Sequence, residues 1–91
     1  DVPIFKIQIF AINRQLTPDS QLFKGHKNVS SEIEGDLYKY MIGNSADYNE
    51  ILRLKEKLKQ DFPQAFIVAF KKGKRMNTGE AIKEFVKTKK K

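Results

Sequence analysis

The sequence predicts one α+β domain, with helices packed on one face of an antiparallel sheet of three to four strands. Three apolar segments, residues 5–12, 37–42 and 65–70, have the composition and length of strands. Two segments, residues 46–62 and 77–86, repeat apolar side chains at helical spacing. The 91 residues suffice for a single domain, residues 1–91, and are too few for two.

The first predicted strand alternates between two faces. Phe5, Ile7, Ile9 and Ala11 share one side, which is uniformly apolar and is therefore the expected core face. Residues 13–36 show no sustained period and are predicted to be an irregular connection. Because 24 residues are many for a loop in so small a domain, this segment either contains short helical turns or has a functional role.

The second predicted strand, residues 37–42, directs Tyr38, Tyr40 and Ile42 toward the core and ends at the turn pair Gly43-Asn44. Ser45 is the predicted N-cap of the following helix, with Asp47 in its first turn. Pro63 ends that helix.

The third predicted strand, residues 65–70, is apolar on both sides. Its larger side chains, Phe66, Val68 and Phe70, are assigned to the core. Residues 74–76 are expected to return after a tight turn at Lys72-Gly73. Asn77 followed by Glu80 resembles a capping box, which begins a C-terminal helix and basic tail over residues 77–91.

One sheet face is left without helices, and we call it the helix-free face. Its mixture of large apolar and hydrogen-bonding groups is typical of an interaction surface and suits a sugar chain, whose rings lie on apolar groups while its hydroxyls meet amides and amines. The alternative is that residues 13–36 or the last helix cover this face as a second core layer. The alternation assigns these residues to it: Lys6, Gln8, Phe10, Ile12, Leu37, Lys39, Met41, Ile67 and Ala69.

The net charge of +7 lies entirely in the last quarter of the chain. Residues 1–70 carry nine basic and nine acidic side chains, whereas residues 71–91 carry nine basic and two acidic ones. This basic end is either a solvated terminus or a tether to an anionic surface. Because the excess charge avoids the sheet, nucleic acid is not the expected partner.

Catalytic and cofactor chemistry is not predicted. The chain has no cysteine and one histidine, His26, which is interpreted as a surface residue without a carboxylate partner. No spacing indicates a nucleophile, an acid–base pair, a metal site or a phosphate loop. No apolar run approaches the roughly 20 residues of a membrane-spanning helix.

Three segments resemble the SPOR (sporulation-related) domain. Residues 5–9 (FKIQI) are similar to its first-strand motif with a Gln, and residues 38–43 (YKYMIG) to its aromatic and basic strand. Residues 62–76 and the tail resemble the divergent form at the C-termini of Bacteroidetes N-acetylmuramoyl-L-alanine amidases. This sequence has Lys39 where the family has Arg, and Phe10-Ala11 where it has small residues.

The resemblance implies a ribonucleoprotein-like fold and a non-catalytic domain that binds peptidoglycan glycan strands, preferentially those stripped of stem peptides. It would direct an amidase, whose zinc-dependent hydrolase domain is separate, to cell-wall substrate in the periplasm. The family's binding positions correspond to Gln8, Lys39 and Ile67. Single-stranded RNA binding and protein interaction through the same face remain the alternatives, and the oligomeric state stays open.

Overall fold

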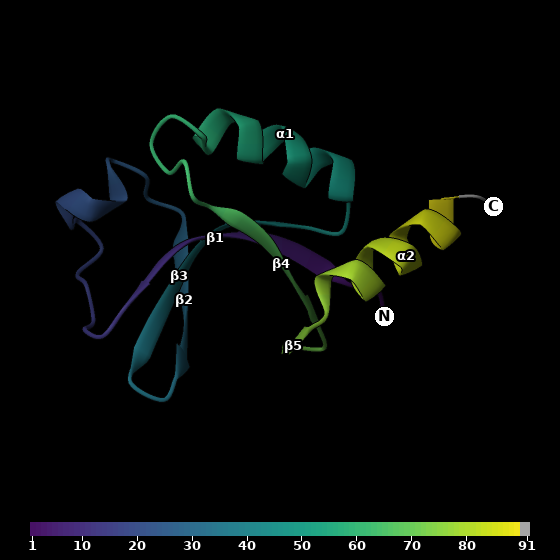
Figure 1. Cartoon of the computed structure of the whole chain (residues 1–91), viewed down its shortest axis with the longest axis horizontal. Helices are drawn as coiled ribbons and strands as arrows, with labels where there is room; N and C mark the ends of the chain where they lie inside the picture. The colour runs from purple at the N-terminus through teal and green to yellow at the C-terminus, as the bar shows by residue number, and fades with distance from the viewer. Residues whose placement is uncertain (90–91) are drawn as a thin grey trace.

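The computed structural model describes residues 1–89, which form five strands, a short 3₁₀ turn and two α-helices (Figure 1). The α+β class is confirmed, but the prediction of three to four strands is too low. Lys90 and Lys91, the end of the predicted basic tail, lie outside the described residues. The elements are β1 (Ile4–Ile12), η1 (Gln21–Phe23), β2 (Val29–Glu34), β3 (Leu37–Ser45), α1 (Tyr48–Leu58), β4 (Phe66–Lys71), β5 (Lys74–Met76) and α2 (Thr78–Lys89).

The five strands form one sheet in the order β2-β3-β1-β4-β5, and every neighbouring pair is antiparallel. Both helices lie on the same face, since Ile51 of α1 and Ala81 of α2 belong to one buried cluster with Phe5 and Ile7 of β1. Phe5 and Ile7 are fully buried, so that truncating Ile7 to Ala would cost about 2–5 kcal/mol. No helix within residues 1–89 is long and apolar enough to cross a membrane.

Strand β2 lies within the segment that the sequence predicted to be irregular, so that prediction is wrong for residues 29–34. The strand pairs with β3 from Val29 opposite Ile42 to Glu34 opposite Leu37. It is an edge strand whose face opposite the helices is polar, which weakens the apolar signal of a strand. Before it, η1 contributes the buried Phe23, which stacks on Phe10 at 5.9 Å between ring centroids.

A bulge in β1 reverses the predicted orientation of its second half. Gln8 lies opposite Met41 and Phe10 opposite Tyr40, so Ile9 is an extra residue on β1. Beyond it, Phe10 and Ile12 pack against the helix-side core while Ala11 is exposed. The placement of Phe10 and Ile12 on the helix-free face, and of Ala11 in the core, is therefore wrong.

The faces of β4 are also opposite to the prediction. Ala69 lies opposite Phe5 and Ile67 opposite Ile7, so both Ile67 and Ala69 face the helices. Ala69 is fully buried beside the large ring of Phe5, where a small side chain fits. The larger side chains Phe66, Val68 and Phe70 lie on the helix-free face instead.

The helix boundaries depend on two capping side chains. Asp47, not Ser45, caps α1, because its Oδ1 accepts hydrogen bonds from the backbone N–H groups of Asn49 and Glu50 at 2.9 and 3.4 Å. Ser45 is the last residue of β3, and its Oγ accepts from the N–H of Asp47. Asn77 caps α2 as expected, since its Oδ1 accepts from the N–H of Glu80 at 2.9 Å.

Candidate functional site

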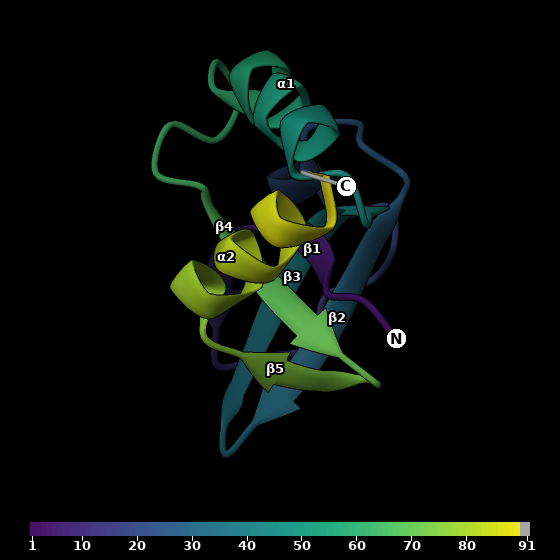
Figure 2. The same ribbon diagram turned by 90° about the vertical axis from the view of Figure 1, so that its right-hand side faces the viewer.

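A side chain from one edge strand of the sheet binds the other edge across the helix-free face. Arg75 of β5 donates from Nε to Oε1 of Glu32 on β2 at 3.0 Å, and from Nη2 to Oε1 of Gln8 on β1 at 3.0 Å. Figure 2 shows the twist that goes with this contact, with β5 running across the direction of β2 and β3. The two edges of the sheet are therefore joined across this face.

Beneath this bridge lies a second small core. Met41, Val68 and Phe70 form a buried cluster, and Gln8 is only 7% exposed. Lys6 Nζ and the guanidinium of Arg75 lie 5.1 and 5.3 Å from the centre of the Phe70 ring, within the range of cation–π attraction. The middle of the helix-free face is thus closed by the contact between Arg75 and Glu32 of the two edge strands. Of the two segments expected to cover it, the last helix lies on the other face, and residues 13–36 take part only through β2.

Lys39 is also engaged within the protein. Its Nζ donates a hydrogen bond to Oε1 of Glu34, diagonally across β2 and β3. This hydrogen bond and the charge of Lys39 hold the pKa of the Glu34 carboxyl below its ordinary value. The positive charge of Lys39 is therefore compensated within the protein.

An open trough remains at the end of the face where β1 begins. It consists of two adjoining hollows of about 330 and 370 Å³, which share Lys6 and Asn44. The floor of the first hollow includes Met41 and Phe70, which are apolar, and its walls carry polar groups. The first hollow is lined by Ile4, Lys6, Ser31, Glu32, Met41, Asn44, Phe70 and Gly73, and the second by Lys6, Asn28, Val29, Ser30, Gly43 and Asn44.

The structure brings only part of the predicted site together. Lys6 and Met41 line the trough, whereas Gln8 is buried under Arg75 and Leu37 is exposed at the far end of β3. The four members that lie on or pack against the helix-covered face are Phe10, Ile12, Ile67 and Ala69.

Sequence reasoning missed the trough residues that come from β2, from β4 and from the end of β3, where the pairing with β1 shifts by one residue between Ile42 and Ser45 and forms a bulge in β3. They include Glu32, Asn44 and Phe70. The alternation of Ser30, Glu32 and Glu34 with Val29 and Ile33 is the signal that would have identified β2. Nothing in the local sequence indicates that Arg75 reaches a strand 43 residues away.

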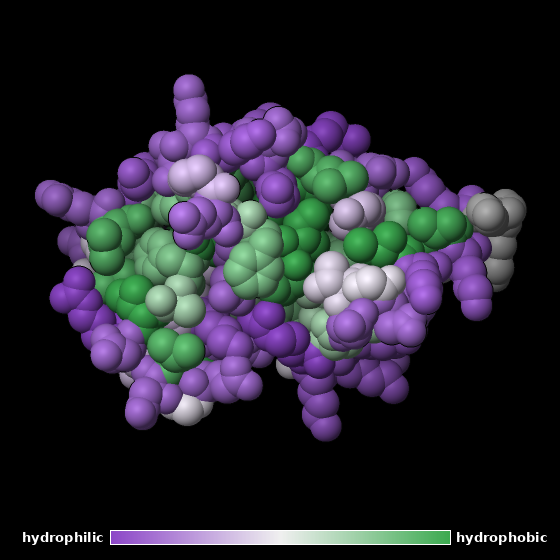
Figure 3. Space-filling model, in the orientation of Figure 1, coloured by the Kyte–Doolittle hydropathy of each residue, from purple (hydrophilic) through white to green (hydrophobic). Residues whose placement is uncertain are grey.

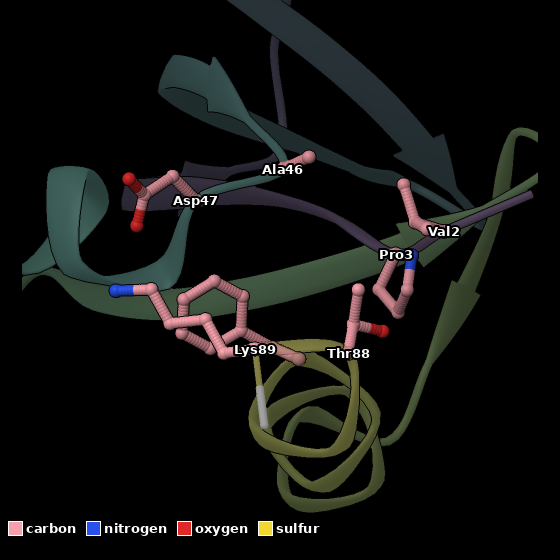
Figure 4. Close-up of a pocket in the computed structure, with 7 residues that line it drawn as sticks. Val2, Pro3, Ala46, Asp47, Thr88 and Lys89 are labelled. Carbon is pink, nitrogen blue, oxygen red and sulfur yellow. The ribbon is translucent and has the colours of Figure 1, made fainter. Parts of the chain in front are cut away.

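A separate hollow of about 300 Å³ lies where the end of α2 meets the N-terminal segment and the β3–α1 junction (Figure 4). Val2, Pro3 and Phe85 make it mainly apolar. The carboxylate of Asp47 at its rim already caps α1. In the space-filling view, apolar side chains also gather over the η1 segment and along β4 and α2, between polar ones (Figure 3).

His26 has a carboxylate partner, contrary to the prediction. Its Nε2 lies 2.9 Å from Oδ2 of Asp61, and its ring packs against Phe62 at 5.5 Å between centroids. This contact joins the segment after η1 to the connection between α1 and β4, which is a structural role. Within residues 1–89, no three His, Cys, Asp or Glu side chains converge as metal ligands would.

The known proteins provide no relative from which a role could be transferred. No protein-family model, no curated protein and no solved structure matches this chain.

Proposed function

We propose that this chain is a non-catalytic domain that binds peptidoglycan glycan strands, preferentially peptide-stripped ones, in the trough of the helix-free face. It would serve as the targeting module of an N-acetylmuramoyl-L-alanine amidase in the cell envelope, with hydrolysis performed by another domain. Tethering raises the local concentration of substrate for such a partner domain.

The trough carries this proposal. It is open to solvent and combines apolar lining from the half-buried Ile4 and Val29 with the amide of Asn44 and the amine of Lys6. Sugar rings present apolar C–H faces and a rim of hydroxyl and acetamido groups, so they need this combination. The site is therefore shifted from Gln8, Lys39 and Ile67 toward the start of β1.

The sheet order supports the resemblance that suggested the function. A central β1 between β3 and β4, with β2 outside and helices on one face, is the arrangement expected of a ribonucleoprotein-like SPOR domain. The segment containing η1 stands in place of that fold's first helix, and β5 adds one further edge strand.

Single-stranded RNA is the second candidate, because β4 exposes half of Phe66 on the helix-free face, where a base could stack. Two observations favour the glycan. The Phe70 ring is buried and already carries Lys6 and Arg75, so it offers no stacking surface to a base. Within residues 1–89, Lys6 is the single cation that lines the trough, whereas an RNA backbone would need several. RNA binding would weaken steeply with added salt, whereas glycan binding would weaken little.

Pelleting with purified cell-wall sacculi, before and after amidase treatment, tests the proposal. The matched variants are Ser30→Trp, which fills the trough with a large side chain, and Gln60→Trp, which adds the same group on the exposed end of the helix layer. We expect the wild type and Gln60→Trp to pellet more strongly with amidase-treated walls, and Ser30→Trp to remain in solution. Equal pelleting of all three proteins would contradict the trough as the site.

Competition by free glycan separates sugar binding from the binding of a protein partner through the same face. Peptide-stripped glycan added in solution should release the wild type from the walls if the sugar itself is bound. A domain that binds a wall-associated protein need not respond to that competitor.

A further inference from the structure

We propose that Lys6 makes the trough selective for an acidic sugar, whose carboxylate it binds between the two hollows. This inference rests on the proposed function and names the chemical class that the site prefers. In peptidoglycan, the carboxylate is the lactyl group of muramic acid, which is free only after the stem peptide has been removed. A uronic acid would present the same group.

The position of Lys6 is the first support. It is the one cationic residue that lines the trough among residues 1–89, and it belongs to both hollows. Within the same residues, its amine lies within ion-pair distance of no carboxylate, whereas Lys39, Lys71 and Arg75 are each paired. Its charge is therefore available to a ligand.

The opposite wall does not neutralise Lys6. Glu32, the acidic residue of the trough, is held by Arg75 through both Nε and Nη2. An acidic ligand in the trough would meet the unpaired ammonium of Lys6, and the charge of the Glu32 carboxylate is already neutralised by Arg75. The local charge thus favours an anionic ligand over a neutral one.

The surroundings of Lys6 suit a carboxylate that is attached to a sugar. The ammonium lies 5.1 Å from the centre of the Phe70 ring, and the half-buried apolar side chains of Ile4 and Val29 line the two hollows to which Lys6 belongs. The exposed amide of Asn44 is shared by the same two hollows and can donate to hydroxyl or acetamido groups. Two neighbouring sugars would occupy the two hollows, with the acidic substituent between them.

The test compares ligands that carry a free carboxylate with ligands that lack one. Wild-type protein, Lys6→Gln and the control Lys74→Gln, which changes an exposed lysine on β5, are titrated with peptide-free glycan strands. The same strands with their carboxyls converted to methyl amides are titrated in parallel. An N-acetylglucosamine oligomer serves as the neutral ligand and an oligouronate as the second acidic source. Thermal unfolding of each variant verifies that it is folded.

We expect amidation of the carboxyls to weaken wild-type binding about tenfold or more, as for loss of a charge-assisted hydrogen bond. Lys6→Gln should bind both forms equally weakly, and Lys74→Gln should behave as the wild type. Equal wild-type affinity for the free and amidated strands would overturn the assignment while the proposed function stands. Binding of the oligouronate alone would support the carboxylate site and contradict peptidoglycan as the ligand. Failure of every acidic ligand to bind would overturn both.

Discussion

Arg75 and Glu32 join the two edge strands of the sheet across its helix-free face. Arg75 Nε lies 3.0 Å from Glu32 Oε1, and the two side chains are only 30% and 28% exposed. The same guanidinium reaches Gln8 on the central strand. This contact buries Met41, Val68 and Phe70 and leaves an open trough at one end of the face, so it defines the candidate site.

Removal of this bridge should destabilise the fold. Arg75→Ala loses charge-assisted hydrogen bonds to Glu32 and Gln8, and we expect the free energy of unfolding to fall by about 1–3 kcal/mol. Urea denaturation measures the change. Lys74→Ala, on the same short strand but exposed, is the matched control and should stay within about 0.5 kcal/mol of the wild type.

A double-mutant cycle separates the bridge from general loss of packing. Arg75→Ala combined with Glu32→Ala should be less destabilised than the sum of the single variants, with a coupling of about 1 kcal/mol. Additive losses would show that the ion pair does not hold the edges together.

Gly43 should be intolerant of a side chain. Its φ is +92°, and a Cβ there would lie 2.8 Å from Leu54 Cδ2 on α1. Gly43→Ala therefore combines backbone strain with a clash, and we expect a loss of about 2 kcal/mol or more. Gly35→Ala is the control, because its φ is +60° but open space surrounds it. Similar losses in thermal or urea unfolding for the two variants would mean that the approach of α1 to the β3 bulge is unimportant.

The Glu34–Lys39 pair predicts a pH dependence of stability. The hydrogen bond from Lys39 lowers the pKa of Glu34 below its ordinary value of 4.5. The stabilisation is therefore complete above pH 4.5 and is lost as the pH falls through the lowered folded-state pKa. Glu34→Gln should be less stable than the wild type at neutral pH, and this difference should shrink in acid.

Direct titration of Glu34 by NMR checks the cause. Lys39→Met removes the donor and the charge, so the pKa of Glu34 should rise toward 4.5. An unchanged pKa in this variant would assign the shift to another group, such as Arg75.

His26 should fasten the η1 segment to the connection after α1. His26→Ala loses the 2.9 Å contact with Asp61 and the packing on Phe62, for which we expect a loss of about 1 kcal/mol. Amide hydrogen exchange should accelerate over residues 20–28 more than in the sheet. The control is Lys27→Ala, which changes the exposed residue next to His26. Uniform exchange rates in His26→Ala and Lys27→Ala would contradict a fastening role.

The class and most elements of the fold were predictable because they depend on local signals. β1, β3 and α1 have strong apolar patterns, and Asn77 marks the start of α2 through its own hydrogen bond. β2 has only a weak local signal, because the polar residues of its helix-free face, Ser30 and Glu32 among them, make its alternation with Val29 and Ile33 resemble a loop. Its pairing with β3 is a tertiary property.

Which face each residue occupies was predicted less well than the strands themselves. Alternation assigns faces only while a strand stays regular, and the single extra residue Ile9 reverses Phe10 and Ile12. In β4 both faces are apolar, so pattern alone cannot choose between them. The tight fit of Ala69 beside Phe5 makes that choice, and it moves Phe66 and Phe70 to the helix-free face.

The most direct test of the trough is a two-dimensional NMR titration of the labelled protein with peptide-free glycan strands. Our account predicts that the resonances of Lys6, Ser30 and Asn44 move together with a single affinity, while those of α1 remain in place. Perturbations confined to the helices, or to the exposed β2–β3 turn, would contradict a glycan site at the start of β1.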